Sequence, residues 1–215
     1  GKLIRCQSYI DIVGTVNGDG THGGLAGLFN EGPDFPQIQD CIFAGSISGP
    51  AVDCCGGLVG WATSIGFISN SLMAGTMNLS TEGGDVICRN NTNAIIADTY
   101  FLPGWSATVP ADAIATDTYE ARSGALCCLL NDGRAEERQA WFQTPDEDFL
   151  PVPDNRHLPV WFFDGAYVNE SPDGLSAQLA NGKSSDEKWF DLSGRRVLGT
   201  PSRGIYITNG KKVLR

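Results

Sequence analysis

Short apolar stretches interrupted by glycine or asparagine recur along the first hundred residues of the chain. Three of them share one pattern, which reads apolar, small or apolar, glycine, hydroxyl, apolar, at residues 12–16, 43–47 and 73–77. Their glycines lie at positions 14, 45 and 75 and are therefore 31 and 30 residues apart. The 3.6-residue period of an amphipathic helix is absent, so this region is predicted to form short strands.

Two further elements recur in the same order along the chain. The sequence Gly-Gly-Leu-Ala-Gly at 23–27 returns as Gly-Gly-Leu-Val-Gly at 56–60, and residues 83–87 are a degenerate third copy. The last element begins with isoleucine and occupies residues 38–41, 68–71 and 96–99. Short strands suit a sandwich, a barrel or a solenoid, but a fixed period of about 30 residues favours a solenoid with parallel strands.

In a solenoid, equivalent residues of successive turns stack in columns. One interior column is expected to hold Leu25, Leu58 and Val86, and a corner column to hold Gly24, Gly57 and Gly84. A further matching position is expected for Cys41, Ser71 and Ile10. Glycine suits the corner because a Cβ would clash there or because φ must be positive.

The Gly-Leu-X-Gly element with its preceding glycine resembles the GLUG repeat of bacterial surface proteins. The resemblance is close at residues 24–27 and 57–60, weak at 84–87, and covers about residues 10–101. It implies a β-helical, extracellular stalk or an adhesin-like segment without catalytic activity. GLUG repeats also occur in the non-catalytic part of some immunoglobulin-A-cleaving peptidases, but their HExxH zinc motif is missing from this sequence.

The middle segment, residues 102–168, has a different pattern. Residues 123–131 are predicted to form a helix that stops at Asp132-Gly133, with a buried face made by Tyr119, Leu126, Leu129 and Leu130. Short aromatic strands are expected at residues 141–143, 149–150 and 159–163.

This middle segment resembles the one that follows GLUG repeats in secreted proteins of Gram-negative gut anaerobes. The residues that carry the resemblance are Ser123, Gly124, Leu126, Leu129, Leu130, Asn131, Trp141 and Gln143. It implies a mixed α/β capping segment that covers the last turn of the solenoid, whose open end would otherwise expose apolar side chains and strand edges.

The C-terminal region divides into a polar linker, residues 169–187, and a small β module, residues 188–215. The linker contains no aromatic residue and could hold one weak strand at 175–179. Strands are predicted at 188–192, 195–198, 204–208 and 211–214, joined in pairs by Ser193-Gly194 and Asn209-Gly210. Asn-Gly between alternating stretches is a strong hairpin signal, so four antiparallel strands are expected.

Residues 189–213 of this module resemble the C-terminal sorting-type domain of the same secreted proteins. The resemblance implies export and display outside the cell, with the secretion route left open. The predicted fold is therefore mainly β. It is a short β-solenoid (β-helix) of degenerate repeats at residues 1–101, followed by the mixed cap at 102–168, the linker and the antiparallel module.

Composition and charge narrow the possible functions. The chain has 215 residues and a net charge of −10, which argues against a nucleic-acid partner. No apolar run is long enough for a membrane-spanning helix. Residues 169–215 carry eight basic and five acidic side chains. This excess of positive charge suits docking to an acidic surface or charged protection of exposed edge strands, and the second role is favoured.

The sequence starts at Gly1 without a signal peptide, and a longer natural protein is expected.

The side chains that could carry chemistry form no catalytic or metal-binding pattern. The seven cysteines lie at positions 6, 41, 54, 55, 88, 127 and 128, and neither a CxxC motif nor a nearby histidine accompanies them. Buried thiols are favoured, and one or two disulfides are the alternative. Residues 17–20 suit a turn better than a calcium loop, and Asp146-Glu147-Asp148 suits a solvated loop without a nameable partner.

Three other groups of side chains could serve catalysis or binding, but structural roles are expected for them. His22 is expected to be a loop residue. Cys127 as a nucleophile with His157 is disfavoured, because the cysteine lies in the most apolar helical stretch. The aromatic residues could form a sugar-stacking platform, but core positions are favoured for those of the middle segment; the tryptophans considered are Trp105, Trp141, Trp161 and Trp189.

Two functions from different classes follow. The first is a non-enzymatic, adhesin-like protein, extracellular or on the outer cell surface, with its β-helical body as a spacer or binding face for an unknown host or bacterial glycan or protein. No catalytic, metal or cofactor residue is assigned, and the binding residues are unknown. The alternative is a carbohydrate-active β-helix, a lyase or hydrolase, or its glycan-binding part. Its candidates are the equivalent Asp40 and Asp98, separated by Asn70, with Arg5 and Arg89 as the basic groups.

Overall fold

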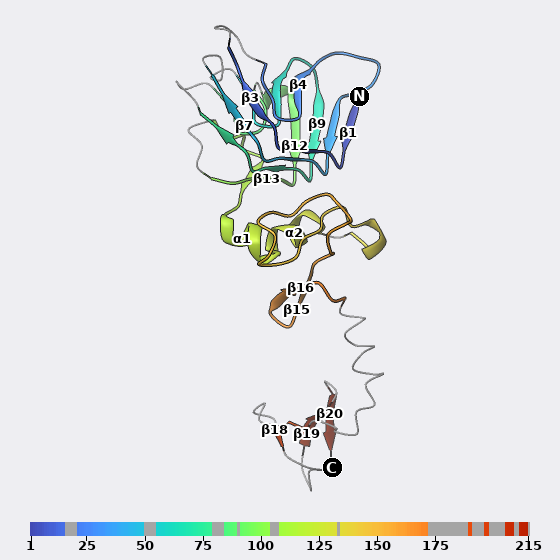
Figure 1. Ribbon diagram of the computed structural model, residues 1–215. Coiled ribbons are helices and arrows are strands. Elements are labelled where there is room, and N and C mark those ends of the chain that lie inside the picture. Colours follow the sequence, from blue (N-terminus) through green and yellow to red (C-terminus); the bar gives the residue numbers. More distant parts are fainter. Residues whose placement is uncertain are drawn as a thin grey trace. The chain divides into compact units, whose positions relative to one another are not determined.

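The chain divides into two compact units, Gly1–Asn169 and Glu170–Arg215. The computed structural model (Figure 1) describes residues 1–15, 21–49, 55–78, 84–89, 91–103, 108–132, 134–171, 189–190, 196–197, 205–208 and 211–214. In these residues the protein is mainly β, with several parallel sheets and a few short helices. No described helix has both the length and the apolar character that crossing a membrane requires.

Four parallel sheets make up the repeat region of the first unit. Sheet A contains, in order, β1 (Lys2–Ile4), β5 (Gln37–Gln39), β9 (Gly66–Ser69) and β12 (Ala94–Ala97). Sheet B contains β14 (Ala113–Ala115), β13 (Thr99–Phe101), β10 (Leu72–Met73), β6 (Ile42–Phe43) and β2 (Gln7–Ser8). Sheet C contains β11 (Thr76–Met77), β7 (Ser46–Ser48) and β3 (Asp11–Val13), and sheet D contains β4 (Ala26–Phe29) and β8 (Val59–Ala62).

The register of sheet A confirms the alignment of the third repeated element. Ile38 lies opposite Ile68, and Ile68 lies opposite Ile96. All three side chains are buried, because alternate residues of each strand point inward. Leu3 lies opposite Ile38 and begins an additional copy of this element, residues 3–6, which sequence analysis did not find.

The predicted interior column is correct for Leu25 and Leu58 and wrong for Val86. Leu25 donates its backbone N–H to the carbonyl oxygen of Leu58 at 3.1 Å, as parallel neighbours do. The next copy is shifted, so that Ile87 takes the place opposite Leu58 and Val86 lies opposite Gly57. Val86 is still buried in the same core. A Cβ at Gly57 would overlap the carbonyl oxygen of Val86, which explains the glycine there and excludes Gly84 from that column.

The first copy of the first element is also shifted. Ile12 lies opposite Ile47, which places Ile10, and not Gly14, opposite Gly45. The predicted grouping of Ile10 with Cys41 and Ser71 is therefore wrong.

Cys6 takes the position that had been expected for Ile10. Its backbone N–H donates to the Sγ of Cys41 at 3.3 Å, and the N–H of Cys41 donates to the Oγ of Ser71 at 3.2 Å. Thr99 is the next member of this column. Small thiol and hydroxyl side chains thus accept hydrogen bonds from the backbone of the preceding repeat.

The segment after the repeats packs against the outer face of sheet B. That face presents Ile42, Leu72 and Tyr100, which form a second core with Leu126, Trp141 and other apolar residues of the segment. These three residues come from three neighbouring strands, so the segment covers the outer face of sheet B across several turns of the repeats. The cap was expected at the last turn, and there the segment's own strand β14 pairs in parallel with β13, the last repeated strand of sheet B. The packing of the segment on the outer face of sheet B was not predicted.

The helix predicted at residues 123–131 is present as α2 (Ala125–Leu130), and a second short helix, α1 (Thr118–Ser123), which was not predicted, precedes it. The two helices meet at Gly124, whose φ of 94° breaks the helical path. Asp117 caps α1 by accepting a hydrogen bond from the backbone N–H of Glu120 at 2.8 Å. Of the predicted buried face, Leu126 and Leu130 are buried, whereas Leu129 of the same helix and Tyr119 of α1 are exposed. The expected stop at Gly133 lies outside the described residues.

Only one of the three expected aromatic strands is present. Strand β15 (Trp161–Phe163) pairs with β16 (Ala166–Val168) in an antiparallel hairpin. Phe142 forms a single antiparallel bridge with Val152, and Phe149 lies in no strand.

In the part of the second unit that the structure describes, there are four short antiparallel strands, as predicted. Their order is β18 (Arg196–Val197), β17 (Trp189–Phe190), β19 (Ile205–Thr208) and β20 (Lys211–Leu214). Thr208 pairs with Lys211, so β19 and β20 form the predicted hairpin, and the turn expected at Asn209-Gly210 lies outside the described residues. The linker strand expected at 175–179, the residues Trp105 and Cys54, and the turn at 17–20 lie outside the described residues.

Candidate functional site

The corner between sheets A and B brings polar side chains into one row. Arg5, Asp40, Asn70 and Asp98 each follow a strand of sheet A, and their φ angles are 54°, 54°, 46° and 45°. Asp and Asn tolerate this left-handed conformation better than most residues do. Because the strands are in register, the four corner residues occupy equivalent positions, as the sequence indicates for Asp40, Asn70 and Asp98.

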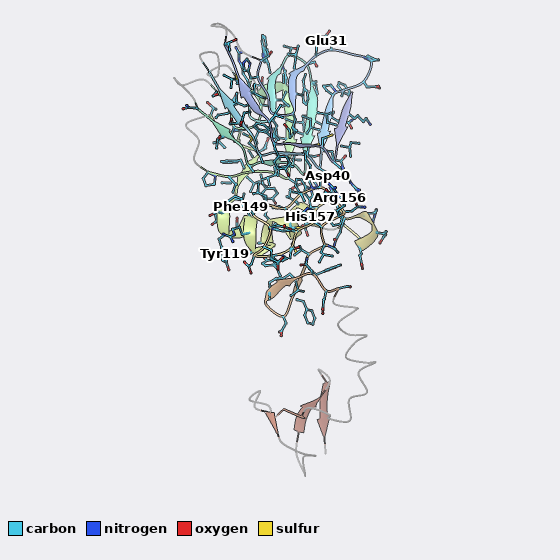
Figure 2. The ribbon with its side chains drawn as sticks, viewed as in Figure 1. Glu31, Asp40, Tyr119, Phe149, Arg156 and His157 are labelled. Carbon is cyan, nitrogen blue, oxygen red and sulfur yellow. The ribbon has the colours of Figure 1, made fainter. Side chains whose placement is uncertain are left out.

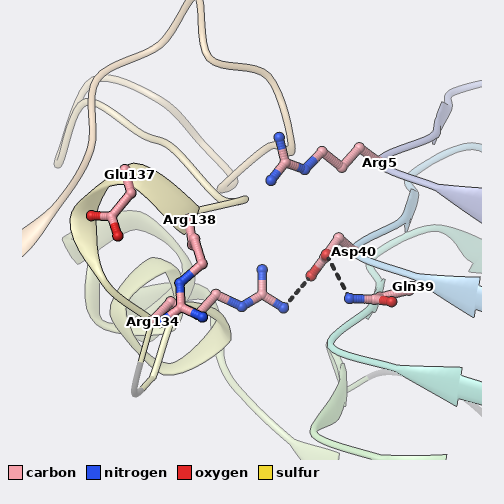
Figure 3. A pocket seen from close by; sticks show the side chains of 6 residues that line it. All are labelled: Arg5, Gln39, Asp40, Arg134, Glu137 and Arg138. Carbon is pink, nitrogen blue, oxygen red and sulfur yellow. Dashed lines mark hydrogen bonds and ion pairs between the residues drawn. The ribbon is translucent and has the colours of Figure 1, made fainter.

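A polar cavity of about 420 Å³, here called the arginine cavity, opens beside this corner. Figure 3 shows its lining, which is Arg5, Gln39, Asp40, Arg134, Glu137 and Arg138. The last two belong to the short 3-10 helix η3 (Glu136–Arg138) of the middle segment. The cavity therefore joins residues that are far apart in the sequence.

Asp40 and Arg134 form a mostly buried ion pair in the wall of the arginine cavity. The guanidinium of Arg134 donates to the Asp40 carboxylate at 2.6 Å, and the two side chains are 17% and 4% exposed. The amide of Gln39 donates to the other Asp40 oxygen at 3.3 Å. Such a buried pair leaves the Asp40 charge neutralised and ties the middle segment to the repeats.

Arg5 and Arg138 are the cavity's remaining cations. Both side chains are exposed. Arg5 donates a long hydrogen bond of 3.5 Å to the backbone carbonyl of Gln139. Among the described residues, neither guanidinium has an acidic partner within ion-pair distance.

A second cavity of about 420 Å³, here called the loop cavity, lies at the opposite end of the strands of sheet A. It is formed by the segments that precede three successive strands, residues 30–36, 63–65 and Asn93. Phe35 is 57% exposed there and packs edge-on against Phe67, with ring centroids 5.9 Å apart. Glu31 and Asp34 add exposed carboxylates.

The outer face of sheet A connects the two cavities. Pro36, directly before β5, lines the loop cavity, and Gln39, the last residue of β5, lines the arginine cavity. At roughly 3.3 Å per residue, this path is about 10 Å long. Phe67 and Ile95 lie side by side on that face, which is only partly covered. Figure 2 shows Glu31 and Asp40 at opposite ends of the repeat region.

The structure brings together only part of the residues considered for a carbohydrate-active enzyme. Arg5 and Asp40 share the arginine cavity, whereas Asp98 is exposed and does not line it. The guanidinium of Arg89 lies 4.9 Å from the ring centroid of Trp61, outside both cavities. Sequence analysis missed Arg134 and Arg138, because no repeat or spacing links them to the corner.

Four of the described cysteines, Cys41, Cys55, Cys88 and Cys127, are buried, which raises the pKa of at least three of their thiols. Burial raises the pKa of Cys127 well above its ordinary value, that of Cys41 to about 11 and that of Cys88 to about 12. Thiols in this state are poor nucleophiles at neutral pH. Within the described residues, no group of three or more His, Cys, Asp or Glu side chains is placed to hold a metal ion.

Asp148 has defined partners, so the expectation of a solvated acidic loop is wrong at this residue. Its Oδ2 accepts the backbone N–H of Thr144 at 2.6 Å and lies 3.0 Å from Nδ1 of His157. Burial raises the pKa of Asp148, but the hydrogen bonds from Thr144 and His157 outweigh it, and the pKa is lowered overall.

Asp148→Asn should therefore destabilise the protein at neutral pH and have little effect in acid. A carboxyl group whose pKa is lower in the folded state stabilises that state above its unfolded pKa of about 4. That contribution is lost as the pH falls through the folded value. Urea unfolding of both proteins at pH 7 and pH 3 measures the difference, and an equal difference at both pH values would contradict the assigned role.

Comparison of the chain with protein-family models, with curated proteins and with solved structures finds no match.

Proposed function

We propose that this protein is a non-enzymatic, adhesin-like saccharide-binding protein that acts outside the cell, and that its repeats form a short β-solenoid. The solenoid is supported by in-register parallel pairing in sheets A, B and C, where each repeated strand pairs with its equivalent in the next repeat. It is also supported by the resemblance of residues 24–27 and 57–60 to GLUG repeats. Display outside the cell is supported by the resemblance of residues 189–213 to a sorting-type domain.

The loop cavity is the observation that carries saccharide binding. A sugar ring presents an apolar C–H face together with hydroxyl groups that donate and accept hydrogen bonds. The exposed ring of Phe35, held in place by Phe67, offers an apolar surface. Around it, Asn30, Glu31 and Asp34 offer amide and carboxylate groups for the hydroxyls.

The same cavity favours the alternative function, a carbohydrate-active enzyme, because it holds two carboxylates. A glycosidase can operate with two such groups, one as acid and one as base or nucleophile. Catalysis, however, requires groups held rigidly toward the substrate. Glu31 and Asp34 are exposed, and no described hydrogen bond or ion pair orients either side chain. This difference favours binding over turnover.

Binding and turnover can be separated with the purified chain. We expect it to retain saccharides on a glycan array and to release no reducing ends or unsaturated products from polysaccharides. Phe35→Ala should weaken binding about tenfold, the value of one aromatic contact of roughly 1.4 kcal/mol. Phe162→Ala is the matched control, because Phe162 is 59% exposed and lines neither cavity.

Two results would overturn the proposed function. One is the absence of binding to any saccharide. The other is product formation above a heat-killed control that disappears in Asp34→Asn, which would establish the enzyme instead.

A further inference from the structure

The two cavities that border the outer face of sheet A differ in charge. The loop cavity contains Glu31 and Asp34 and no basic residue. The arginine cavity contains three arginines, of which Arg134 is neutralised by Asp40. Glu137 is its second acidic residue, and it forms no ion pair with a described residue.

Arg5 and Arg138 therefore supply guanidinium groups with no acidic partner among the described residues, and the long hydrogen bond of Arg5 to Gln139 leaves most of its N–H donors for an anion. A guanidinium presents several N–H donors in one plane and matches the oxygens of a carboxylate or sulfate. The two side chains come from opposite walls of the cavity, one from the corner of the repeats and one from η3. In a chain with a net charge of −10, a cavity lined by three arginines is a distinct local feature.

We infer that the arginine cavity is an anion subsite, which binds the carboxylate or sulfate group of a saccharide that lies along the outer face of β5. The inference rests on the proposed saccharide-binding function. The sugar in the loop cavity would contact Phe35, and the chain would continue over Gln37 toward Arg5 and Arg138. The path of about 10 Å between the cavities suits a short oligosaccharide.

The acidic residues of the loop cavity restrict where the ligand can carry negative charge. A densely charged polyanion would place negative groups beside Glu31 and Asp34, where they would be repelled. The preferred ligand therefore carries its acid at one end only. This distinguishes a specific subsite from general attraction of polyanions to arginine.

The test uses a glycan array with matched pairs. Each neutral oligosaccharide is compared with the same oligosaccharide carrying one terminal sialic acid, uronic acid or sulfate, and heparin serves as the dense polyanion. We expect the singly charged members to bind at least about tenfold more tightly than their neutral counterparts, and heparin to bind less well than the best of them. The carboxylate and sulfate members show which anion is preferred.

Variants of the full chain then locate the effect. Arg138→Gln and Arg5→Gln should each remove most of the preference for the charged member while leaving binding of the neutral member unchanged. Glu137→Gln should strengthen binding of the charged member several-fold, because it removes a negative charge from the cavity. Arg156→Gln is the matched control, since Arg156 pairs with Asp154 and lines neither cavity. Thermal unfolding of each variant verifies that it is folded.

The possible failures are distinguishable. If neutral and charged members bind equally, or if the preference survives in both arginine variants, the anion subsite is refuted and saccharide binding stands. If heparin binds best, the cavity is a general polyanion surface and the inference is wrong. If no saccharide binds, the proposed function fails and the inference fails with it.

Discussion

Replacing Trp141 with alanine should lower the free energy of unfolding by about 3–5 kcal/mol, the usual cost of deleting a buried aromatic side chain. Trp141 is fully buried in the core between sheet B and the middle segment. Its Nε1–H also donates to the backbone carbonyl of Asn70 at 3.2 Å. The change therefore removes packing and leaves that carbonyl without its partner, at the contact that holds the middle segment on the repeats.

Urea unfolding followed by circular dichroism measures this effect. Phe162→Ala is the matched control, because that side chain is exposed and its loss should cost less than about 1 kcal/mol. A small effect of Trp141→Ala would mean that the middle segment is not held on sheet B through this residue. Two separate transitions in the variant would show that the repeats fold without the segment.

Leu58→Ala is the second large change, with an expected loss of about 2–5 kcal/mol. Leu58 is fully buried and stacks between Leu25 and Ile87 of the neighbouring repeats. Removing its side chain opens a cavity in the column, and the close parallel pairing on both sides limits how far the neighbours can collapse into it.

Leu28→Ala is the control for this position. Leu28 lies in β4, which pairs with the strand that directly follows Leu58, but its side chain is 44% exposed, so the expected loss is below about 1 kcal/mol. Equal losses for the two leucines would contradict the interior position of Leu58. Because both leucines lie outside the two cavities, saccharide binding by the folded fraction should be unchanged.

Local patterns were sufficient for the repeated strands and for part of their pairing, but not for the aromatic strands of the middle segment, of which only β15 is present. Ile38, Ile68 and Ile96 could be aligned from the sequence because side chains at one register position of a parallel sheet share one environment. The C-terminal hairpin followed from alternating residues around Asn209-Gly210. Both features depend on residues close in sequence or on a regular period, and these signals survive in the sequence without any knowledge of the fold.

The strand register predicted from the sequence was wrong where the length of the repeat changed. The first two repeats are offset by 35 residues, as in the pairing of Ile12 with Ile47. The later offsets are shorter, with 30 residues between Ile38 and Ile68 and 28 between Ile68 and Ile96. A search for an even period therefore aligned Gly14 with Gly45 and overlooked the copy that begins at Leu3. Only hydrogen bonding between neighbouring strands reveals which residue faces which, because an insertion in a loop leaves the strand pattern itself unchanged.

The candidate sites depended most on tertiary structure. Asp40 and Arg134 are 94 residues apart in the chain and form one ion pair because the middle segment packs on sheet B. Arg5 and Arg138 reach the same cavity for that reason. The sequence by itself thus determined a mainly β chain with parallel repeats and a C-terminal hairpin. Long-range packing, which no local spacing records, decided which charges meet and where an anion could bind.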